Sequence, residues 1–225
     1  MNDEDTRTGQ QGKALARTLP ELIDSWFGDT ARAGVDLIGG HYVQELAKIN
    51  RAVVAEKIKA RLEALKIQQP KPISPRVLIP AIEALSEESD DLLQDIWANL
   101  FTNAMDPSAD VDLQKILIET LRQFEPIDTV LLHEIDEIVQ GRSDIAEPNL
   151  EAIASKLGVR SMALALSHER LARLGCVQVN TSRFSPKGPT AKDGEKEYRV
   201  RGQHPLFNVT ALGLELLRAV SPDRK

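Results

Sequence analysis

Five carboxylates lie close together near the middle of the chain, where they could bind a metal ion or work as an acid–base pair. They are Glu87, Glu88, Asp90, Asp91 and Asp95. Glu87, Asp91 and Asp95 recur every four residues and would share one face of a helix that began early enough. No histidine accompanies them, and carboxylates are also favourable at the positive end of a helix dipole. A solvated helix start explains the cluster better, so we predict no metal and no cofactor.

The four histidines do not complete a catalytic pattern either. His133 precedes Glu134, but the second histidine of a metalloprotease helix is missing. His168 falls on the apolar side of its expected helix and reads as a core or interface residue rather than a base. His41 and His204 are isolated.

The remaining signatures of catalysis are missing as well. The chain contains no nucleophile elbow, phosphate-binding loop or dinucleotide fingerprint. Its single cysteine, Cys176, rules out an internal disulfide and reads as a small buried hydrophobe. We therefore predict no catalytic residues and a protein that is not an enzyme. A toxin-like effector, whose active site is assembled from residues distant in the sequence, is the alternative.

Basic residues in the last third of the chain are candidates for binding nucleic acid. The set is Arg160, Ser161, Arg170, Arg173, Arg183, Lys187, Lys192, Lys196, Arg199 and Arg201. Such side chains neutralise phosphates and give salt-dependent binding of low sequence specificity. The stretch SMALALS at 161–167, however, has few side chains that could read base edges. Contact with nucleic acid and a structural or dimerisation role both remain open.

Composition and charge indicate the fold class and the division of the chain that carries these residues. The chain has 225 residues, 42% hydrophobic but only 4% aromatic, which favours packed helices over a sheet sandwich. Its net charge of −6 is unevenly divided, since residues 70–141 carry 15 acidic and 4 basic side chains and residues 142–225 carry 9 and 14. Different partners for the two parts are therefore expected.

We predict a mainly α protein, a helical bundle followed by a C-terminal winged helix-turn-helix with a small β-wing. The predicted division is a disordered tail at 1–12, an N-terminal long-helix region at 13–69, a helical core domain at 70–141 and a winged-helix domain at 142–225. The polar, acidic N-terminus does not resemble a signal peptide. The apolar run at 34–43 is too short to span a bilayer, so we expect a cytoplasmic protein.

The first half of the chain predicts two amphipathic helices. A short one covers residues 13–27, although Pro20 could instead mark its start. The second region covers residues 30–66 as one long helix or as two in line, with the kink expected at Gly39-Gly40. Its part at 42–66 either packs on the rest of the fold or offers an exposed seam for self-association, and we expect a homo-oligomer through it.

The centre of the fold is expected at Asp90 to Asp106. Apolar residues recur there every three or four positions, Ser89 can cap the start, and Leu92 and Phe101 widen the apolar stripe. A helix at 75–85 precedes it, with Pro80 in its first turn if that helix starts late. Helices at 109–124 and 126–139 follow, the second opened by Pro126.

The last third has the order of a winged helix. Helices at 149–157 and 160–174 are separated by a turn at Gly158 and Val159. A strand at 176–179, a polar loop at 180–205, a return strand at 206–209 and a final helix capped by Thr210 follow.

A motif across the middle of the chain resembles the Abi-alpha family of bacterial abortive-infection proteins. The motif opens with Pro-Ile-Ser-Pro and closes with Asn-Ala-Met-Asp. Its most specific residues are Pro72, Pro75, Leu93, Gln94, Trp97, Ala98, Leu100, Asn103 and Asp106. The resemblance implies a role in anti-phage defence but supplies no catalytic residues.

Together, these observations predict a non-enzymatic abortive-infection component. It would bind an infection-derived or host partner, such as a phage protein or a nucleic acid, through helical and winged-helix surfaces. The alternative is a DNA-binding transcriptional regulator of the winged helix-turn-helix type.

Overall fold

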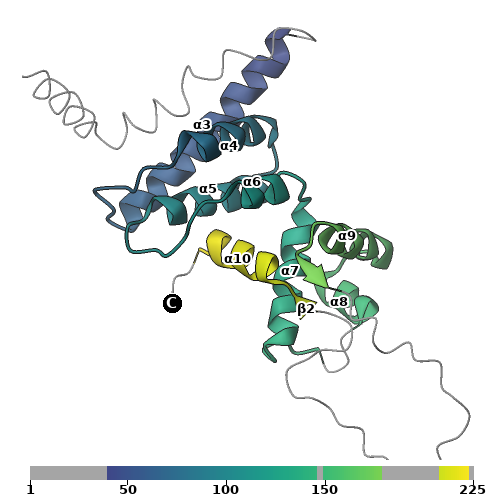
Figure 1. Ribbon diagram of the computed structural model, residues 1–225. Helices are drawn as coiled ribbons and strands as arrows, with labels where there is room; N and C mark the ends of the chain where they lie inside the picture. The colour runs from purple at the N-terminus through teal and green to yellow at the C-terminus, as the bar shows by residue number, and fades with distance from the viewer. Residues whose placement is uncertain (1–39, 146–148, 179–207, 223–225) are drawn as a thin grey trace, which may run out of the picture. The chain divides into compact units, whose positions relative to one another are not determined.

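A computed structural model describes residues 40–145, 149–178 and 208–222. Within these ranges the chain forms eight helices and a sheet of two short strands, so the mainly α prediction is confirmed (Figure 1). The predicted tail at 1–12, the helix at 13–27 and the polar loop at 180–205 lie outside the described residues. None of the described helices is long and apolar enough to cross a membrane.

The chain divides into two compact units. Unit 1 comprises Met1–Ile118 together with Ala219–Lys225, and unit 2 comprises Glu119–Arg218. The limits predicted at residues 12, 69 and 141 stay predictions.

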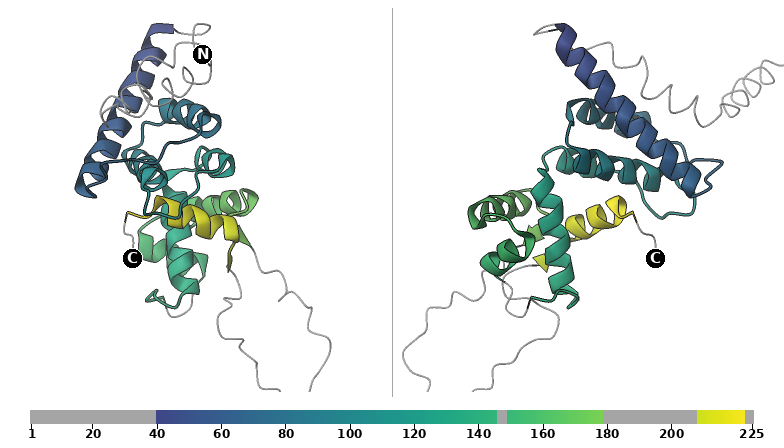
Figure 2. Two further views of the ribbon diagram at one scale, coloured as in Figure 1. Left: turned by 60° about the vertical axis from the view of Figure 1, so that its left-hand side comes forward. Right: turned by 180° about the vertical axis from the view of Figure 1, so that it is seen from behind.

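In unit 1, helix α3 (Gly40–Ala64) packs on both α4 (Pro75–Glu87) and α5 (Asp91–Met105). Its inward residues lie seven or four positions apart, on one side of the helix; they are Ala47, Val54, Ile58 and Leu62. Gly40 is the first described residue of α3. The kink expected at Gly39-Gly40 therefore lies at the edge of the described residues and stays a prediction. The N-terminal end of α3 projects beyond α4 and α5 (Figure 2).

Helix α4 begins with Pro75 in its first turn and contains Pro80 in its interior. The proposal that Pro80 belongs to a first turn is therefore wrong. A proline inside a helix removes one backbone hydrogen bond, so burial must hold the helix together there. Ala81, Ile82 and Leu85 supply that burial immediately after the proline.

Helix α5 is buried along most of its length, as expected for the centre of the fold. Trp97 is only 1% exposed, and Leu100 and Phe101 are fully buried. Leu92, expected to widen the apolar stripe, is instead exposed. The helix is capped by Asp90 rather than Ser89, because the Asp90 carboxylate accepts hydrogen bonds from the backbone N–H groups of Leu92 and Leu93 at 3.0 and 3.1 Å.

The helix expected at 109–124 is shorter than its apolar periodicity predicted. Helix α6 covers only Lys115–Leu121. Before it, Val111 and Leu113 are buried while Asp112 is exposed, an alternation typical of extended chain. The backbone carbonyl of Val111 also accepts a hydrogen bond from Lys71 Nζ at 3.3 Å. The residues predicted to form the first turns of this helix are therefore extended, and alternate side chains among them are buried.

Unit 2 contains α7 (Pro126–Val139), α8 (Leu150–Leu157), α9 (Ser161–Arg173) and most of α10 (Ala211–Val220). Asn149 caps α8 through a hydrogen bond from Ala152 N at 2.9 Å. Gly158 ends that helix with a φ of 65°, a left-handed conformation that favours glycine. The turn between α8 and α9 therefore lies where the sequence predicted it.

Both strands of unit 2 lie within their expected ranges, 176–179 and 206–209, of which residues 179, 206 and 207 are outside the described residues. Strand β1 (Val177–Gln178) pairs antiparallel with β2 (Asn208–Val209), and Val177 lies opposite Val209. Directly after β2, the Thr210 hydroxyl accepts a hydrogen bond from Gly213 N at 3.1 Å, which confirms it as the cap of α10. The element order from α8 to α10 is as predicted.

Candidate functional site

Helix α9 is fixed to α7 by a buried polar cluster centred on Asp128. Asp128 is fully buried, and its two carboxylate oxygens accept hydrogen bonds from Ser167 Oγ and Arg170 Nε, each at 2.6 Å. The backbone N–H of Glu125 donates a third bond at 2.7 Å, which also caps the start of α7. One face of α9 is therefore committed to the interior of unit 2.

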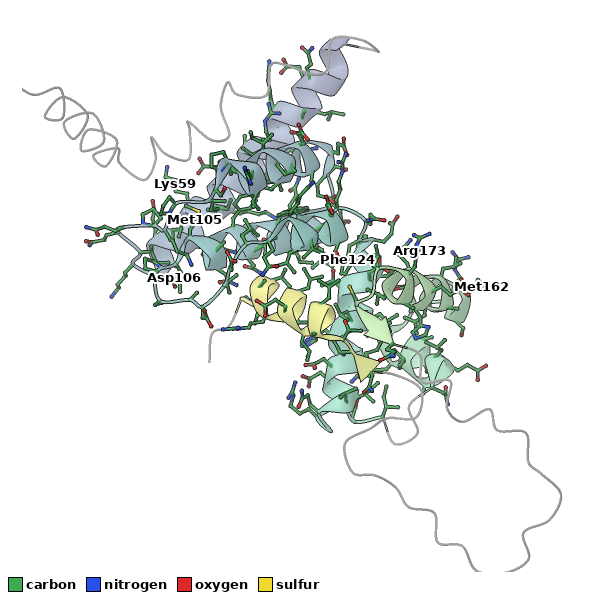
Figure 3. All side chains as sticks on the ribbon, viewed as in Figure 1. Lys59, Met105, Asp106, Phe124, Met162 and Arg173 are labelled. Atoms are coloured by element: carbon green, nitrogen blue, oxygen red, sulfur yellow. The ribbon has the colours of Figure 1, made fainter. Side chains whose placement is uncertain are left out.

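The opposite face of α9 carries large apolar side chains into solvent. Met162 is 73% exposed and Leu166 57%, and the two lie one turn apart on the helix. Arg160 precedes the helix and is exposed. Arg173 ends the helix and is also exposed, as is Met162 (Figure 3). We call these four residues the α9 face. An exposed apolar pair bracketed by cations is suited to contact a partner.

The predicted nucleic-acid residues are divided by the structure. Arg160, Ser161 and Arg173 are exposed, whereas Arg170 is turned toward Asp128. The other six lie outside the described residues; they are Arg183, Lys187, Lys192, Lys196, Arg199 and Arg201. Whether these residues bind nucleic acid stays a prediction.

A serine and a lysine approach each other in unit 2 in a way that the sequence did not indicate. Lys156 Nζ lies 3.4 Å from Ser143 Oγ, and both atoms contact Glu134 Oε1, at 2.8 and 2.6 Å. Hydrogen bonds from Lys156 to Asp144 and Glu134 raise the pKa of the lysine. A lysine that activates a serine needs a lowered pKa, so this group serves as an ion-pair cluster between α7 and α8.

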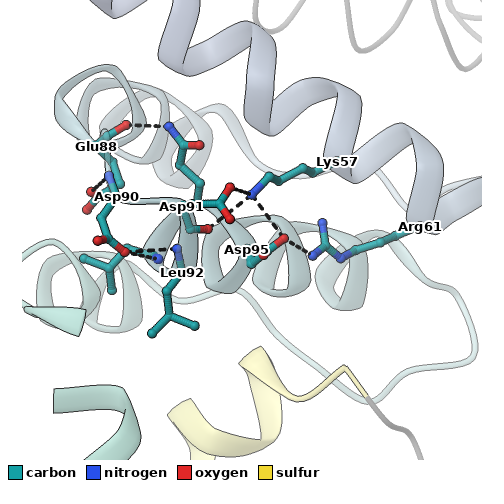
Figure 4. A network of polar contacts seen from close by, with 9 residues as sticks. Lys57, Arg61, Glu88, Asp90, Asp91, Leu92 and Asp95 are labelled. Carbon is teal, nitrogen blue, oxygen red and sulfur yellow. Dashed lines mark hydrogen bonds and ion pairs between the residues drawn. The ribbon is translucent and has the colours of Figure 1, made fainter. Parts of the chain in front are cut away.

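The acidic cluster of the sequence is paired with cations of α3. Lys57 Nζ contacts Asp91 Oδ1 at 2.6 Å and Asp95 Oδ1 at 3.3 Å, and Arg61 also pairs with Asp95 (Figure 4). Burial raises the pKa of Asp95, but hydrogen bonds from Arg61 and Lys57 outweigh that effect and leave it below its ordinary value. The described residues contain no group of three or more potential metal ligands.

The other charged residues of this region act on local structure. Asp90 caps α5, and the Glu88 carboxylate accepts a hydrogen bond from Asp90 N at 2.9 Å (Figure 4). The helix-start interpretation of the acidic cluster therefore fits these contacts. Sequence spacing did not reveal the pairing with α3, because the partners are 34 residues apart.

The motif residues of α5 are largely internal. Leu93, Gln94, Trp97, Ala98, Leu100, Asn103 and Asp106 are buried, whereas Pro72 and Pro75 are exposed. The Asn103 side-chain amide donates to the backbone carbonyls of Ala219 and Ser221, at 2.8 and 3.0 Å, within unit 1. Asp106 accepts hydrogen bonds from Ser108 N and Oγ at 2.7 Å. These contacts give the motif a role in the architecture of unit 1.

Two further side chains considered for chemistry are buried. His168 is 9% exposed, and burial lowers its pKa, with a smaller opposing effect of Glu169, so the imidazole is neutral at pH 7. Cys176 is fully buried, and burial raises the pKa of its thiol to about 11. Both therefore act as core residues, as the sequence indicated.

The fold and these surfaces define a mainly helical protein whose exposed candidate site is the α9 face. The sequence profile described as abortive infection alpha matches residues 44–220. The chain therefore belongs to the abortive infection alpha family, and this membership indicates a role in abortive-infection defence. No curated protein and no solved structure matches the chain.

Proposed function

We propose that this protein is a non-enzymatic abortive-infection component that binds an infection-derived or host protein through the α9 face. The observation that carries the proposal is the exposure of Met162 and Leu166 on a helix whose other side is fixed by Asp128. Burying these two side chains against a partner would contribute roughly 1.5–3 kcal/mol each. A cytoplasmic location and a winged-helix C-terminal domain are parts of the same proposal.

The winged-helix part rests on the element order α8, Gly158 turn, α9, β1, β2 and α10. In DNA-binding winged helices the second helix of the motif reads base edges through hydrogen-bonding side chains. Met162 and Leu166 offer no such groups, and only Ser161, Glu169 and Arg173 supply them among the exposed positions of α9. The composition of the α9 face therefore favours a protein partner over sequence-specific contact with DNA.

A phage-challenge assay tests the proposal. We expect Met162→Glu with Leu166→Glu to abolish protection, because carboxylates would have to be desolvated in the interface. The matched control is Ile79→Glu, which alters an equally exposed apolar residue on α4. Circular dichroism and thermal unfolding establish that both variants fold. Full protection by the folded double variant would contradict the proposal.

The alternative is a DNA-binding regulator that dimerises through residues 42–66. It predicts a dimer with two α9 helices about 34 Å apart, one turn of DNA. A gel-shift titration with double- and single-stranded DNA and RNA over a salt series tests it, together with light scattering. Absence of binding at low salt would remove nucleic acid as a partner. A homo-oligomer would use the exposed residues Leu46, Ile49 and Val53 of α3.

A further inference from the structure

Helix α3 has an apolar stripe that is left partly exposed within the part of the chain that the structure describes. Leu46, Ile49 and Val53 are 39%, 55% and 36% exposed, and their spacing of three and four places them on one side of the helix. We call these three residues the α3 stripe. Three large hydrophobic side chains are thus exposed within eight residues. Such a cluster is typical of a contact surface.

The α3 stripe runs from the first half of α3 (Gly40–Ala64) to its middle, and the N-terminal end of this helix projects beyond α4 and α5 (Figure 2). Polar contacts between α3 and α4 include those of Asn50 and Arg51, which donate to Ser86 O and Oγ at 3.1 and 2.9 Å. Polar contacts with α5 include that of Lys57 Nζ with Asp91 Oδ1 at 2.6 Å. The stripe lies on a different side of the helix from the buried residues Ala47, Val54 and Ile58.

The chain that leads into α3 carries a complementary set of apolar residues. Leu15, Leu19, Leu22, Ile23 and Trp26 recur every three or four positions within residues 13–27. A segment of this length forms a marginal helix at best in water unless its apolar side is covered. We therefore expect this segment to need an apolar surface to pack on, and the α3 stripe is such a surface.

The connection between the two is long enough for them to meet. Twelve residues, 28–39, separate Phe27 from Gly40, and that many can span up to about 40 Å. Val53 lies 13 residues into α3, about 20 Å from its start. A short tether also gives the joined surfaces an effective concentration on the order of millimolar, which exceeds that of a second copy at micromolar protein.

We propose that residues 13–27 of this chain dock on the α3 stripe. The stripe is then covered within one molecule, and a second copy must displace this segment in order to associate through α3. This inference is independent of the function proposed for the α9 face, which lies in the other unit.

Cross-linking between introduced cysteines tests the proposal on the full chain. The pair Ser25→Cys and Ala52→Cys places one thiol in the segment and one at an exposed position beside the stripe. Cys176 is buried and the pKa of its thiol is about 11, so we expect it not to react with a short bis-maleimide. We expect cross-links within one chain, seen as a fast-migrating monomer on a denaturing gel.

Two matched variants make the result specific. In the control pair, Ser25→Cys is combined with Ile79→Cys, which places the second thiol at an exposed position of α4. We expect the yield of intramolecular cross-links to be at least fivefold lower than for the pair Ser25→Cys and Ala52→Cys. Adding Ile49→Asp to the first pair should reduce cross-linking to that level. Links only between chains would assign the stripe to a second copy and overturn the proposal. Equal yields for the Ala52 and Ile79 pairs would overturn it as well.

Tryptophan fluorescence provides a second measurement without cysteines. Trp26 and Trp97 are the only tryptophans, and Trp97 is buried in α5. We expect Ile49→Asp with Val53→Asp to make one tryptophan more accessible to acrylamide and to shift its emission to the red. Identical quenching in the wild-type and substituted proteins would contradict docking, provided that circular dichroism shows both to be folded.

Discussion

Arg170 Nε donates a hydrogen bond to the fully buried carboxylate of Asp128 over 2.6 Å, and this contact gives α9 its orientation on α7. A basic residue predicted to face nucleic acid is thus partly buried, with its side chain 24% exposed, and pairs with a carboxylate in the interior of unit 2. The helix then presents Met162 and Leu166, rather than its guanidinium at 170, to solvent.

The first prediction concerns two arginines on the same helix. Arg170→Ala should lower the free energy of unfolding of unit 2 by about 3–5 kcal/mol, because it leaves the buried carboxylate of Asp128 without its counter-charge. Arg173→Ala should change it by no more than about 0.5 kcal/mol, because that side chain is exposed. Urea unfolding measured by circular dichroism compares the two. Equal effects would show that Arg170 does not hold α9.

The second prediction separates two candidate caps of α5. Asp90→Ala should lower the free energy of unfolding by about 1 kcal/mol, since it removes the acceptor for the N–H groups of Leu92 and Leu93. Ser89→Ala, the matched control one residue earlier, should be nearly neutral. Thermal unfolding of the two variants side by side decides between them. A larger loss for Ser89→Ala would reverse the assignment.

The third prediction is a pH dependence at Asp95. Its folded-state pKa is lowered, so the carboxylate contributes stability above its unfolded pKa of about 4, and this contribution is lost as the pH falls through the folded value. Because Asp95 is partly exposed, Asp95→Asn should cost at most about 1 kcal/mol at pH 7. Chemical unfolding between pH 2 and 7 should show the difference from wild type shrinking toward zero in acid. A constant difference would contradict the ion-pair explanation.

Local patterns in the sequence predicted the elements better than their contacts. The apolar spacing around Trp97 and the turn at Gly158 were sufficient to place α5, α8 and α9, since helix periodicity and left-handed glycines are local properties. The helix expected at 109–124 failed because Val111 and Leu113 also fit a spacing of two, and only packing decides between the two periods.

The inward orientation of Arg170 could not be predicted from the sequence. Its partner Asp128 is 42 residues away, and a basic residue near the end of a helix has the same local pattern whether it faces solvent or a buried carboxylate. The pairing of Lys57 with Asp91 and Asp95 was missed for the same reason. Only the packing of one helix on another brings these charges together.

The fourth prediction uses the single cysteine as a probe of unit 2. Cys176 is fully buried and the pKa of its thiol is raised to about 11, mainly by desolvation, with a contribution from Asp128. Thiolate is the reactive form, so at pH 8 the native protein should react with an aromatic disulfide reagent far more slowly than the urea-unfolded protein. Absorbance of the released thiolate follows the reaction. Equally fast labelling of the native protein would show that the strand β1 region opens readily.

The fifth prediction concerns Gly213, in the first turn of α10. A Cβ added there would lie 2.2 Å from the backbone carbonyl oxygen of Cys176 and 2.8 Å from Val209 Cγ1. Alanine normally stabilises a helix relative to glycine by about 1 kcal/mol. Here the clash with a backbone atom forces α10 away from β1 and β2, so Gly213→Ala should instead destabilise the protein by about 1–3 kcal/mol. Leu214→Ala, at the exposed neighbouring position, is the control and should be nearly neutral. Thermal unfolding of both variants gives the sign, and a stabilised Gly213→Ala protein would mean that α10 does not approach Cys176 this closely.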